Sequence, residues 1–426
     1  MLKSTKKFFI AGSIFLGLSE AYSLTDSAEK LIYFETRANA VSQRETRPIP
    51  MPHFEIPLSM VKLDLNRSFT ENELSSLIFE KEGKKYFRWI LNPEDTHWYA
   101  QVKEYYERKG VRLEKKYYFT GYQTASRSYI VENPEKTLQF SVKSSTNVTG
   151  GHWLDKKQPV GDAIDSRMNA EFLSMIQKNI PFKNIIIMDE PAIAKIPDID
   201  QAIVIRDLSG LNDKTKGVIY LPGFSALHES TGKQIALMNG SNDPAAFWTK
   251  HYIEAAGRAL GEFAARTGMQ YDSPHSQNFL IELDRNYKPT GRIVFRDLAD
   301  LYINKDTMRV LHPQYANYFE KFSEKGNILD HISAGFGPLH GNRFPIWVSE
   351  KIYDQWKEVF FQSFEAEFSR VSGLSPNEFK VSNGYRNGKY FMNSYRIKQN
   401  EQTKEFWSNM NTYKNPNPFM GCRALF

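Results

Sequence analysis

Short apolar runs separated by polar turns predict that the first half of the chain contains β-strands. Residues 116–120, 128–131 and 138–143 are rich in β-branched and aromatic side chains. Because only short segments separate these runs, we expect them to pair as an antiparallel sheet. Three further apolar runs bounded by Pro and Gly predict buried strands at residues 184–188, 202–207 and 217–221.

Two longer stretches show the apolar spacing of helices. In residues 162–177 the apolar side chains fall near one helical face, and Asp162 is available as the N-cap. Residues 244–267 show the same spacing, and Gly268 is a typical C-terminal stop. The aromatic-rich residues 311–372 also favour helix. Together these patterns predict an α+β fold, with an antiparallel sheet lobe and a mostly helical C-terminal half.

The first residues predict export. Lysines precede an apolar run over residues 8–18, and small residues at Ala21 and Ser23 fit a signal-peptidase site, so we predict a signal peptide over residues 1–23. An uncleaved anchor is the alternative, although a run of eleven apolar residues is short for a membrane span. We therefore expect a periplasmic or secreted protein with no stable membrane insertion after cleavage.

Composition divides the rest of the chain into three parts. Residues 24–58 are polar and then punctuated by proline, which predicts a linker along a surface. Residues 59–200 are expected to form an N-terminal α/β lobe with antiparallel strands, in which the dense aromatics of residues 86–106 serve core or inter-domain packing. Residues 201–426 are expected to form the C-terminal domain.

Charge and motif content exclude several classes of protein. Lys and Arg number 55 against 49 Asp and Glu, and the excess is interspersed with acidic residues, so the mild basicity suits anionic ligands and predicts no nucleic acid partner. The single Cys422 excludes an intramolecular disulfide and a cysteine-based metal site. No P-loop, His-Glu-x-x-His or Gly-x-Ser-x-Gly motif occurs, which argues against P-loop nucleotide hydrolysis, zinc hydrolysis and serine hydrolysis.

The polar turn of residues 274–278 carries the most informative chemistry. Its last residue, Asn278, lies nineteen positions before Asp297, which follows an apolar strand. An amide oxygen and a carboxylate brought together by two short strands can hold Mg²⁺ against phosphate oxygens. A purely structural polar turn, closed by the neighbouring Arg296 and Asp297, is the alternative.

A second group of candidates ends the predicted strand over residues 138–143. Lys143 could contact nucleotide phosphates as a kinase β3 lysine does, with Glu171 on the following helix as its ionic partner. The alternative is a solvated lysine at a strand end. The hydroxyls of Ser145 and Thr146, which precede Gly150 and Gly151, could bind a phosphate tail.

Four groups of residues then follow one another in a recognisable order. They are Ser141 to Thr146 with Arg167; Arg206-Asp207; His275-Ser-Gln277-Asn278 with Arg296-Asp297; and Lys389 to Arg396 with Asn415-Pro-Asn417-Pro418-Phe. This order resembles the NRPS-independent siderophore synthetases of the aerobactin-synthetase type, over about residues 138–419. The resemblance implies a kinase-like palm that binds ATP and Mg²⁺. It further implies small-molecule partners, because such enzymes adenylate a carboxylate of citrate or a related acid, and an amine or alcohol then displaces AMP.

Transferred by position, the resemblance also assigns roles. His275 and Arg167 would contact the phosphates or the carboxylate, and Lys389 would stabilise charge on the acyl adenylate. The nucleotide would be bound by Lys143, Ser145, Thr146, Gln277, Arg206 and Glu171, and the metal by Asn278 and Asp297.

The chain also departs from the family pattern. Ser273 stands where the family usually has an acidic residue, and the N-terminal His-Pro-x-His-Lys motif is missing. A kinase-like phosphotransferase with Asp272 as base, and an exported binding protein without catalysis, are therefore the alternative functions.

Overall fold

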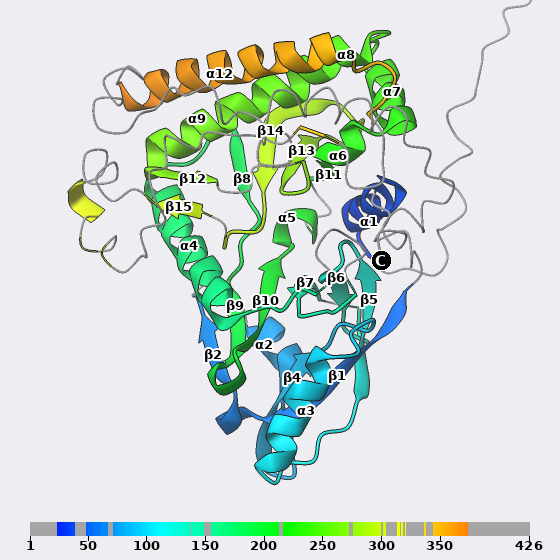
Figure 1. Cartoon of the computed structure of the whole chain (residues 1–426), viewed down its shortest axis with the longest axis vertical. Coiled ribbons are helices and arrows are strands. Elements are labelled where there is room, and N and C mark those ends of the chain that lie inside the picture. Colours follow the sequence, from blue (N-terminus) through cyan, green and yellow to red (C-terminus); the bar gives the residue numbers. More distant parts are fainter. Residues whose placement is uncertain are drawn as a thin grey trace, which may run out of the picture.

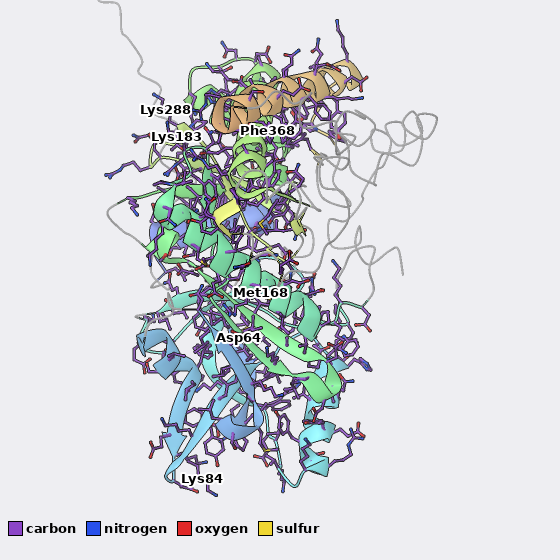
Figure 2. All side chains as sticks on the ribbon, turned by 90° about the vertical axis from the view of Figure 1, so that its left-hand side faces the viewer. Asp64, Lys84, Met168, Lys183, Lys288 and Phe368 are labelled. Atoms are coloured by element: carbon purple, nitrogen blue, oxygen red, sulfur yellow. The ribbon has the colours of Figure 1, made fainter. Side chains whose placement is uncertain are left out.

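The computed structural model describes residues 24–38, 48–66, 71–136, 138–148, 155–212, 216–271, 276–299, 301–303, 313–315, 317, 320, 336–337 and 344–373. A nine-stranded sheet fills the lower half of the molecule, and a four-stranded sheet lies above it, beneath two long helices (Figure 1). A two-stranded sheet joins β12 (Met269–Tyr271) to β15 (Leu301–Ile303). Lys84 lies at one extreme of the long axis and Phe368 near the other (Figure 2).

The nine-stranded sheet is antiparallel, in the order β2-β9-β10-β7-β6-β5-β1-β4-β3. Its strands are β1 (Ile49–Pro57), β2 (Lys62–Leu65), β3 (Ile78–Lys81), β4 (Lys84–Ile90), β5 (Lys116–Gln123), β6 (Ser128–Glu132), β7 (Gln139–Lys143), β9 (Ala192–Ile196) and β10 (Gln201–Asp207). The three strands predicted between residues 116 and 143 are therefore confirmed as adjacent antiparallel neighbours. One face packs with α3 (Trp98–Arg108) into an apolar core that includes Trp89 and Tyr106, as expected for the aromatics of residues 86–106.

The four-stranded sheet has the order β11-β13-β14-β8. Its strands are β8 (Ile185–Ile187), β11 (Ile219–Pro222), β13 (Phe279–Leu283) and β14 (Pro289–Phe295). Strands β13 and β14 form the predicted hairpin, and Phe279 lies opposite Phe295. Because paired residues sit side by side, Asn278 and Asp297 emerge at the same end of the hairpin.

Helices cover the upper sheet. The predicted helix over residues 244–267 is present as α8 (Pro244–Trp248), a π-helical turn (Thr249–Glu254) and α9 (Ala255–Thr267), and Gly268 ends it in the left-handed conformation at φ 67°. Helix α12 (Glu350–Ser372) crosses α9 closely. A Cβ at Gly257 or Gly261 would come within 2.5 Å of a carbonyl oxygen of α12, so both positions require glycine for this approach.

The remaining helices are α1 (Asp26–Ala38), α2 (Glu71–Leu77), α4 (Val160–Asn179), α5 (Ser209–Asn212), α6 (Gly223–Ala226) and α7 (Glu229–Met238). Helix α4 corresponds to the predicted helix over residues 162–177. Its N-cap is Pro159 instead of Asp162, and the N–H of Val160 donates to Asp200 Oδ1 at 2.8 Å.

The prediction of a linker over residues 24–58 is wrong. Helix α1 buries Leu31 and Phe34, and β1 is an inner strand between β5 and β4. Of the prolines that suggested a linker, Pro52 lies where the register of β1 shifts, between Met51 and Pro52. A bulge of this kind leaves a residue outside the regular ladder, which is where a strand tolerates proline.

The structure confirms a mixed α+β fold with a large antiparallel sheet. The C-terminal half carries two sheets as well as helices, and the nine-stranded sheet includes β10, so the predicted boundary after residue 200 falls between the paired strands β9 and β10. Among the described helices, none combines the length and apolarity of a bilayer-spanning segment. The predicted signal peptide, residues 1–23, lies outside the described residues.

Candidate functional site

Two basic residues share one face of the nine-stranded sheet. In the register of β7 and β10, Ser141 lies opposite Arg206, and Lys143 lies opposite Val204. Since side chains alternate along a strand, Lys143 and Arg206 point away from the core that Phe140 fills. They therefore face the end of the β13–β14 hairpin.

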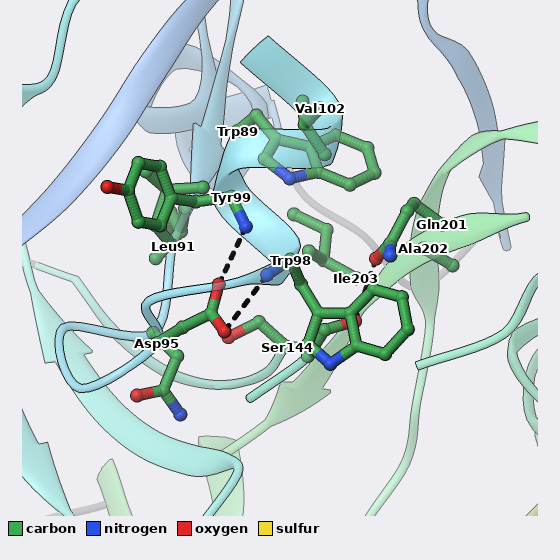
Figure 3. A pocket seen from close by; sticks show the side chains of 13 residues that line it. Trp89, Leu91, Asp95, Trp98, Tyr99, Val102, Ser144, Gln201, Ala202 and Ile203 are labelled. Atoms are coloured by element: carbon green, nitrogen blue, oxygen red, sulfur yellow. Dashed lines mark hydrogen bonds between the residues drawn. The ribbon is translucent and has the colours of Figure 1, made fainter. Parts of the chain in front are cut away.

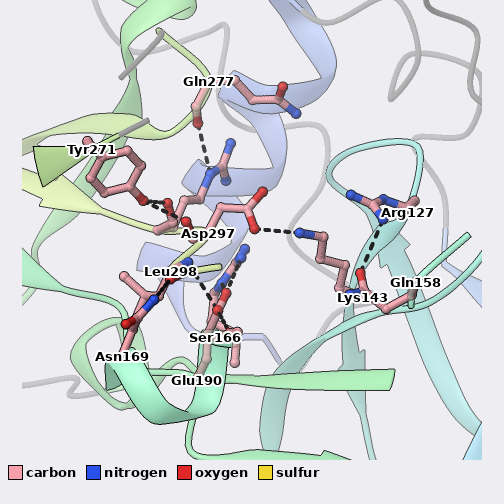
Figure 4. Close-up of polar contacts among 12 residues, drawn as sticks. Arg127, Lys143, Gln158, Ser166, Asn169, Glu190, Tyr271, Gln277, Asp297 and Leu298 are labelled. Atoms are coloured by element: carbon pink, nitrogen blue, oxygen red, sulfur yellow. Dashed lines mark hydrogen bonds and ion pairs between the residues drawn. The ribbon is translucent and has the colours of Figure 1, made fainter. Parts of the chain in front are cut away.

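Asp297 meets Lys143 from the upper sheet. The ammonium of Lys143 donates to Asp297 Oδ1, although the two residues are 154 positions apart (Figure 4). Asp297 has φ 69°, a left-handed conformation that is uncommon for a residue other than glycine. The side chains are 11% and 23% exposed, so the pair is shielded but reachable by a ligand.

The charges around Asp297 keep it ionised. Burial alone would raise the pKa of this carboxyl group, but the positive charges of Lys143, Arg206 and Arg127 outweigh that effect and hold the pKa well below its usual range. Since Glu190 also pairs with Arg206, these three cations face two carboxylates, and one positive charge is left in excess. An anionic ligand would be attracted to such a site.

Glu190 holds the main chain beside Asp297. It is only 1% exposed and joins three elements: its Oε1 accepts from Arg206 Nε at 3.0 Å and Nη2 at 2.5 Å, and its Oε2 accepts from Ser166 of α4 and from the N–H of Leu298 at 3.1 Å. The residue after Asp297 is thereby tied to both β10 and α4 (Figure 4).

Three more residues fix the same turn. The hydroxyl of Tyr271 donates to the carbonyl oxygens of Arg296 and of Asp297, the latter at 2.9 Å. Asn169 Nδ2 donates to the Leu298 carbonyl at 2.7 Å. Arg296 pairs with Glu35 of α1 at 2.6 Å, and both side chains are buried. The segment expected to be a linker therefore supports the candidate site.

The predicted metal ligands lie at one end of the hairpin. The N–H of Arg296 donates to the Asn278 carbonyl at 3.2 Å, and Arg296 Nε donates to the Gln277 carbonyl at 2.9 Å. An ionised carboxylate on Asp297 and a buried amide on Asn278 are the oxygen donors that Mg²⁺ prefers, with phosphate and water oxygens completing its shell. Among the described His, Cys, Asp and Glu residues, no group of three or more could hold a metal by itself. Two protein oxygen donors would leave most of the coordination shell of such a metal to water and ligand oxygens.

Arg167 and Glu171 also belong to α4, but they do not pair with the groups around Asp297. Arg167 pairs with Asp64 of β2 and with Glu171 at 2.7 Å. The expectation that Glu171 pairs with Lys143 is therefore wrong, because Lys143 reaches across to the hairpin instead of to the helix. The roles of Arg167 and Glu171 toward a ligand stay predictions.

Ser145 and Thr146 continue from Lys143 toward α3. Ser145 Oγ donates to Gln201 Oε1 at 2.7 Å and accepts from the N–H of Gln158 at 2.7 Å, while Thr146 is fully buried in a bridge with Lys156. Ser144 and Ser145 line a small hollow beside Trp98 (Figure 3). Since the side chain of Gln158 accepts from Arg127 at 3.2 Å, Ser145 is linked to the basic site through one residue.

Sequence reasoning missed six contributors to this site, namely Glu35, Arg127, Ser166, Asn169, Glu190 and Tyr271. None of them belongs to a motif, and they meet only through the long-range pairing of the strands. The predicted residues His275 and Lys389 lie outside the described part of the chain, as do Arg396 and Asn417.

The fold is similar to solved proteins of siderophore synthesis. The petrobactin biosynthesis protein AsbB from Bacillus anthracis has a TM-score of 0.51 at 13% identity, over 89% of this chain and 69% of that protein. For the aerobactin synthetases of a hypervirulent pathotype of Klebsiella pneumoniae, IucC gives 0.49 at 9% identity over 77% and 63% of the two chains, and ATP-bound IucA gives 0.47 at 12% over 76% and 63%.

The similarity to the petrobactin biosynthesis protein confirms the structural resemblance to NRPS-independent siderophore synthetases over most of the chain. The chain covers 63% of the length of each aerobactin synthetase, which is less than two thirds. No protein-family model matches the sequence, and no curated protein matches it.

Proposed function

We propose that this chain is an ATP- and Mg²⁺-dependent enzyme of the siderophore-synthetase type, which adenylates a carboxylate of a citrate-like acid and condenses it with an amine or alcohol. The observation that carries the proposal is the Lys143–Asp297 ion pair, which joins the two sheets of a fold similar to that of a petrobactin biosynthesis protein. The excess of positive charge around the pair suits a polyanionic substrate.

Asp297 and Asn278 would hold the metal. Bound Mg²⁺ supplies charge neutralisation to the phosphate oxygens of the nucleotide. With the Asp297 carboxylate holding the metal, the flexible Lys143 ammonium would be free to contact a phosphate oxygen. Arg127, on the loop before β6, adds a second positive charge on the same side, because its charge reaches Asp297.

In the proposed reaction a carboxylate oxygen of the acid attacks the α-phosphorus of ATP and pyrophosphate leaves. The amine nitrogen or alcohol oxygen then attacks the activated carbonyl carbon, AMP leaves with the bonding electron pair, and the nucleophile loses its proton. Negative charge develops on phosphate oxygens in the first step. Lys143 and Arg127 are held where they can stabilise that charge without solvent rearrangement.

A kinase-like phosphotransferase is the second candidate, because a lysine paired with a metal-binding aspartate also serves phosphoryl transfer. The arrangement of Glu171 weighs against it. In the kinase pattern a helix glutamate pairs with the lysine, whereas Glu171 pairs with Arg167.

Product analysis tests the proposal. The purified chain is incubated with Mg·ATP, a panel of di- and tricarboxylic acids, and hydroxylamine as a small nucleophile. We expect acid-dependent AMP, pyrophosphate and a hydroxamate, and none of them from Lys143→Met or Asp297→Asn. Formation of ADP instead would support phosphotransfer. Binding of ATP without any product would support a non-catalytic binding protein, and no binding of ATP would reject the proposal.

A further inference from the structure

The candidate site contains two buried carboxylates and two cations that are paired in a definite way. Glu190 forms an ion pair with Arg206, and Asp297 forms an ion pair with Lys143. One carboxylate nevertheless brings Arg206 near Asp297, because Glu190 accepts from Arg206 through Oε1 and from the N–H of Leu298, the residue after Asp297, through Oε2. Asp297 is also the other carboxylate whose charge acts on Arg206, so without Glu190 it would be the anion available to the guanidinium.

The two possible partners of Asp297 differ in how readily a metal could replace them. Lysine is a flexible point charge on a four-carbon stem, whereas the planar guanidinium of arginine forms two directed hydrogen bonds with one carboxylate. Arg206 is 6% exposed and already directs two N–H groups onto Glu190, both to its Oε1. An arginine bound to Asp297 in the same way would compete strongly with a divalent cation.

Glu190 is itself held in place. Its Oε2 accepts from Ser166 and from the N–H of Leu298, while Oε1 serves Arg206. Both oxygens are thus committed, and the residue is almost fully buried. This fixed anion can keep Arg206 in one position whether or not Asp297 changes its partner.

We propose that Glu190 is a positioning residue, which holds Arg206 away from Asp297 so that Lys143, an exchangeable cation, is the group paired with the metal-binding carboxylate. The inference rests on the proposed function, in which Asp297 binds Mg²⁺. Glu190 belongs to none of the motifs, and its proposed role is to keep the Asp297 carboxylate available to the metal.

The test uses Mn²⁺ as a paramagnetic substitute for Mg²⁺, with α,β-methylene ATP, whose α–β bond cannot be cleaved. Dissociation constants are measured by the electron paramagnetic resonance signal of free Mn²⁺. In Glu190→Gln the amide keeps the side-chain shape but loses the charge that holds Arg206. We expect binding roughly 10- to 100-fold weaker than in the natural chain, the range typical of residues that support metal ligands.

The double variant Glu190→Gln/Arg206→Met separates this role from a structural one. It removes the competing guanidinium and leaves no unpaired buried charge, so it should fold even where the single variant does not. Because the structure engages the Arg206 guanidinium with Glu190, its loss should cost little nucleotide affinity, and we expect the double variant to recover most of the Mn²⁺ affinity. A double variant as weak as Glu190→Gln, or a single variant that binds like the natural chain, would overturn the inference.

Glu262→Gln is the matched control. Glu262 is also fully buried, also accepts from an arginine, Arg266, at 2.7 Å, and also accepts from main-chain N–H groups, those of Lys183 and Asn184. These residues precede β8, whereas Glu190 follows it, so the control lies at the opposite end of that strand. We expect it to lose stability while its Mn²⁺ affinity is unchanged.

A crystal structure of Glu190→Gln provides a second test, which requires no bound metal. We expect the guanidinium of Arg206 on the carboxylate of Asp297, and a guanidinium that remains on the substituted amide side chain would contradict the inference. If the natural chain fails to bind the Mn²⁺ nucleotide, the proposed function fails, and this structural result still decides whether Glu190 controls the position of Arg206.

Discussion

On one face of the nine-stranded sheet, Phe119, Phe140 and Val142 pack into an apolar core, whereas on the other face the same strands present Ser141, Lys143 and Arg206. Apolar side chains also occur on the polar face. Val204 packs under α4 at one side, and Tyr122 and Ile130 pack with α1 at the other. A strip of polar residues remains between these two apolar patches, and Asp297 meets it from the upper sheet.

The difference shows how one sheet can serve both stability and chemistry. Alternation places every second side chain on the opposite face, so β7 contributes to the core and to the site over five residues. Changes on the apolar face should therefore act through folding, and changes in the polar strip mainly through ligand binding. The following predictions test this division.

The largest effect is expected from Phe140→Ala. Phe140 is 1% exposed and packs edge-to-face against Phe119 with ring centroids 5.6 Å apart. Removing the ring should cost about 3–5 kcal/mol of unfolding free energy, measured by urea denaturation. Its neighbour on the other face provides the control, because Ser141→Ala should cost about 1 kcal/mol or less. Equal losses in the two variants would contradict the division between the faces.

A pH-dependent loss of stability is expected from His53, farther along the polar face in β1. Burial, with a smaller contribution from the positive charge of Arg88, lowers the pKa of His53 to about 4. The folded state thus binds fewer protons than the unfolded chain, whose histidine pKa is about 6.5. The stability that depends on a neutral His53 is therefore fully present above pH about 6.5. It declines by about 3 kcal/mol as the pH falls toward 4.

The check is urea denaturation at pH 7 and at pH 4.5. The natural chain should lose more stability between these two values than His53→Leu, in which the titrating group is absent. Equal losses in the two proteins would show that protonation of His53 does not contribute to the loss of stability.

The sequence predicted local elements well and long-range partners poorly. Asn278 and Asp297 were placed on one hairpin because a short pair of strands fixes their ends, and the structure confirms that geometry. Helix α1 was missed because charged residues obscure its buried face, and no local pattern shows that Glu35 reaches Arg296. Such contacts depend on how two sheets pack, which periodicity along one segment does not determine.

A smaller effect on stability and a larger one on binding are expected from Lys143→Met. The loss of one hydrogen bond to a charged group should cost about 1–3 kcal/mol, because Arg206 and Arg127 still balance the charge of Asp297. Binding of Mg·ATP, measured by calorimetry, should fall below detection. Lys195→Met is the control, since Lys195 of β9 is similarly buried but pairs with Asp64 at 3.6 Å. Loss of binding in both variants would mean that the site is not confined to the polar strip.

The smallest effect is expected from Glu171→Gln, although the sequence suggested Glu171 as the partner of Lys143. The Glu171 side chain is 42% exposed and forms an i,i+4 pair with Arg167, which keeps a second partner in Asp64. Exposed helical pairs contribute about 0.3–0.5 kcal/mol, so unfolding by urea should change by no more than that. Because Lys143 is already paired across the two sheets, the affinity for Mg·ATP should be unchanged. A marked loss of affinity would instead mean that Glu171 approaches Lys143 when the nucleotide binds, which would revive the kinase-like arrangement and extend the polar strip onto α4.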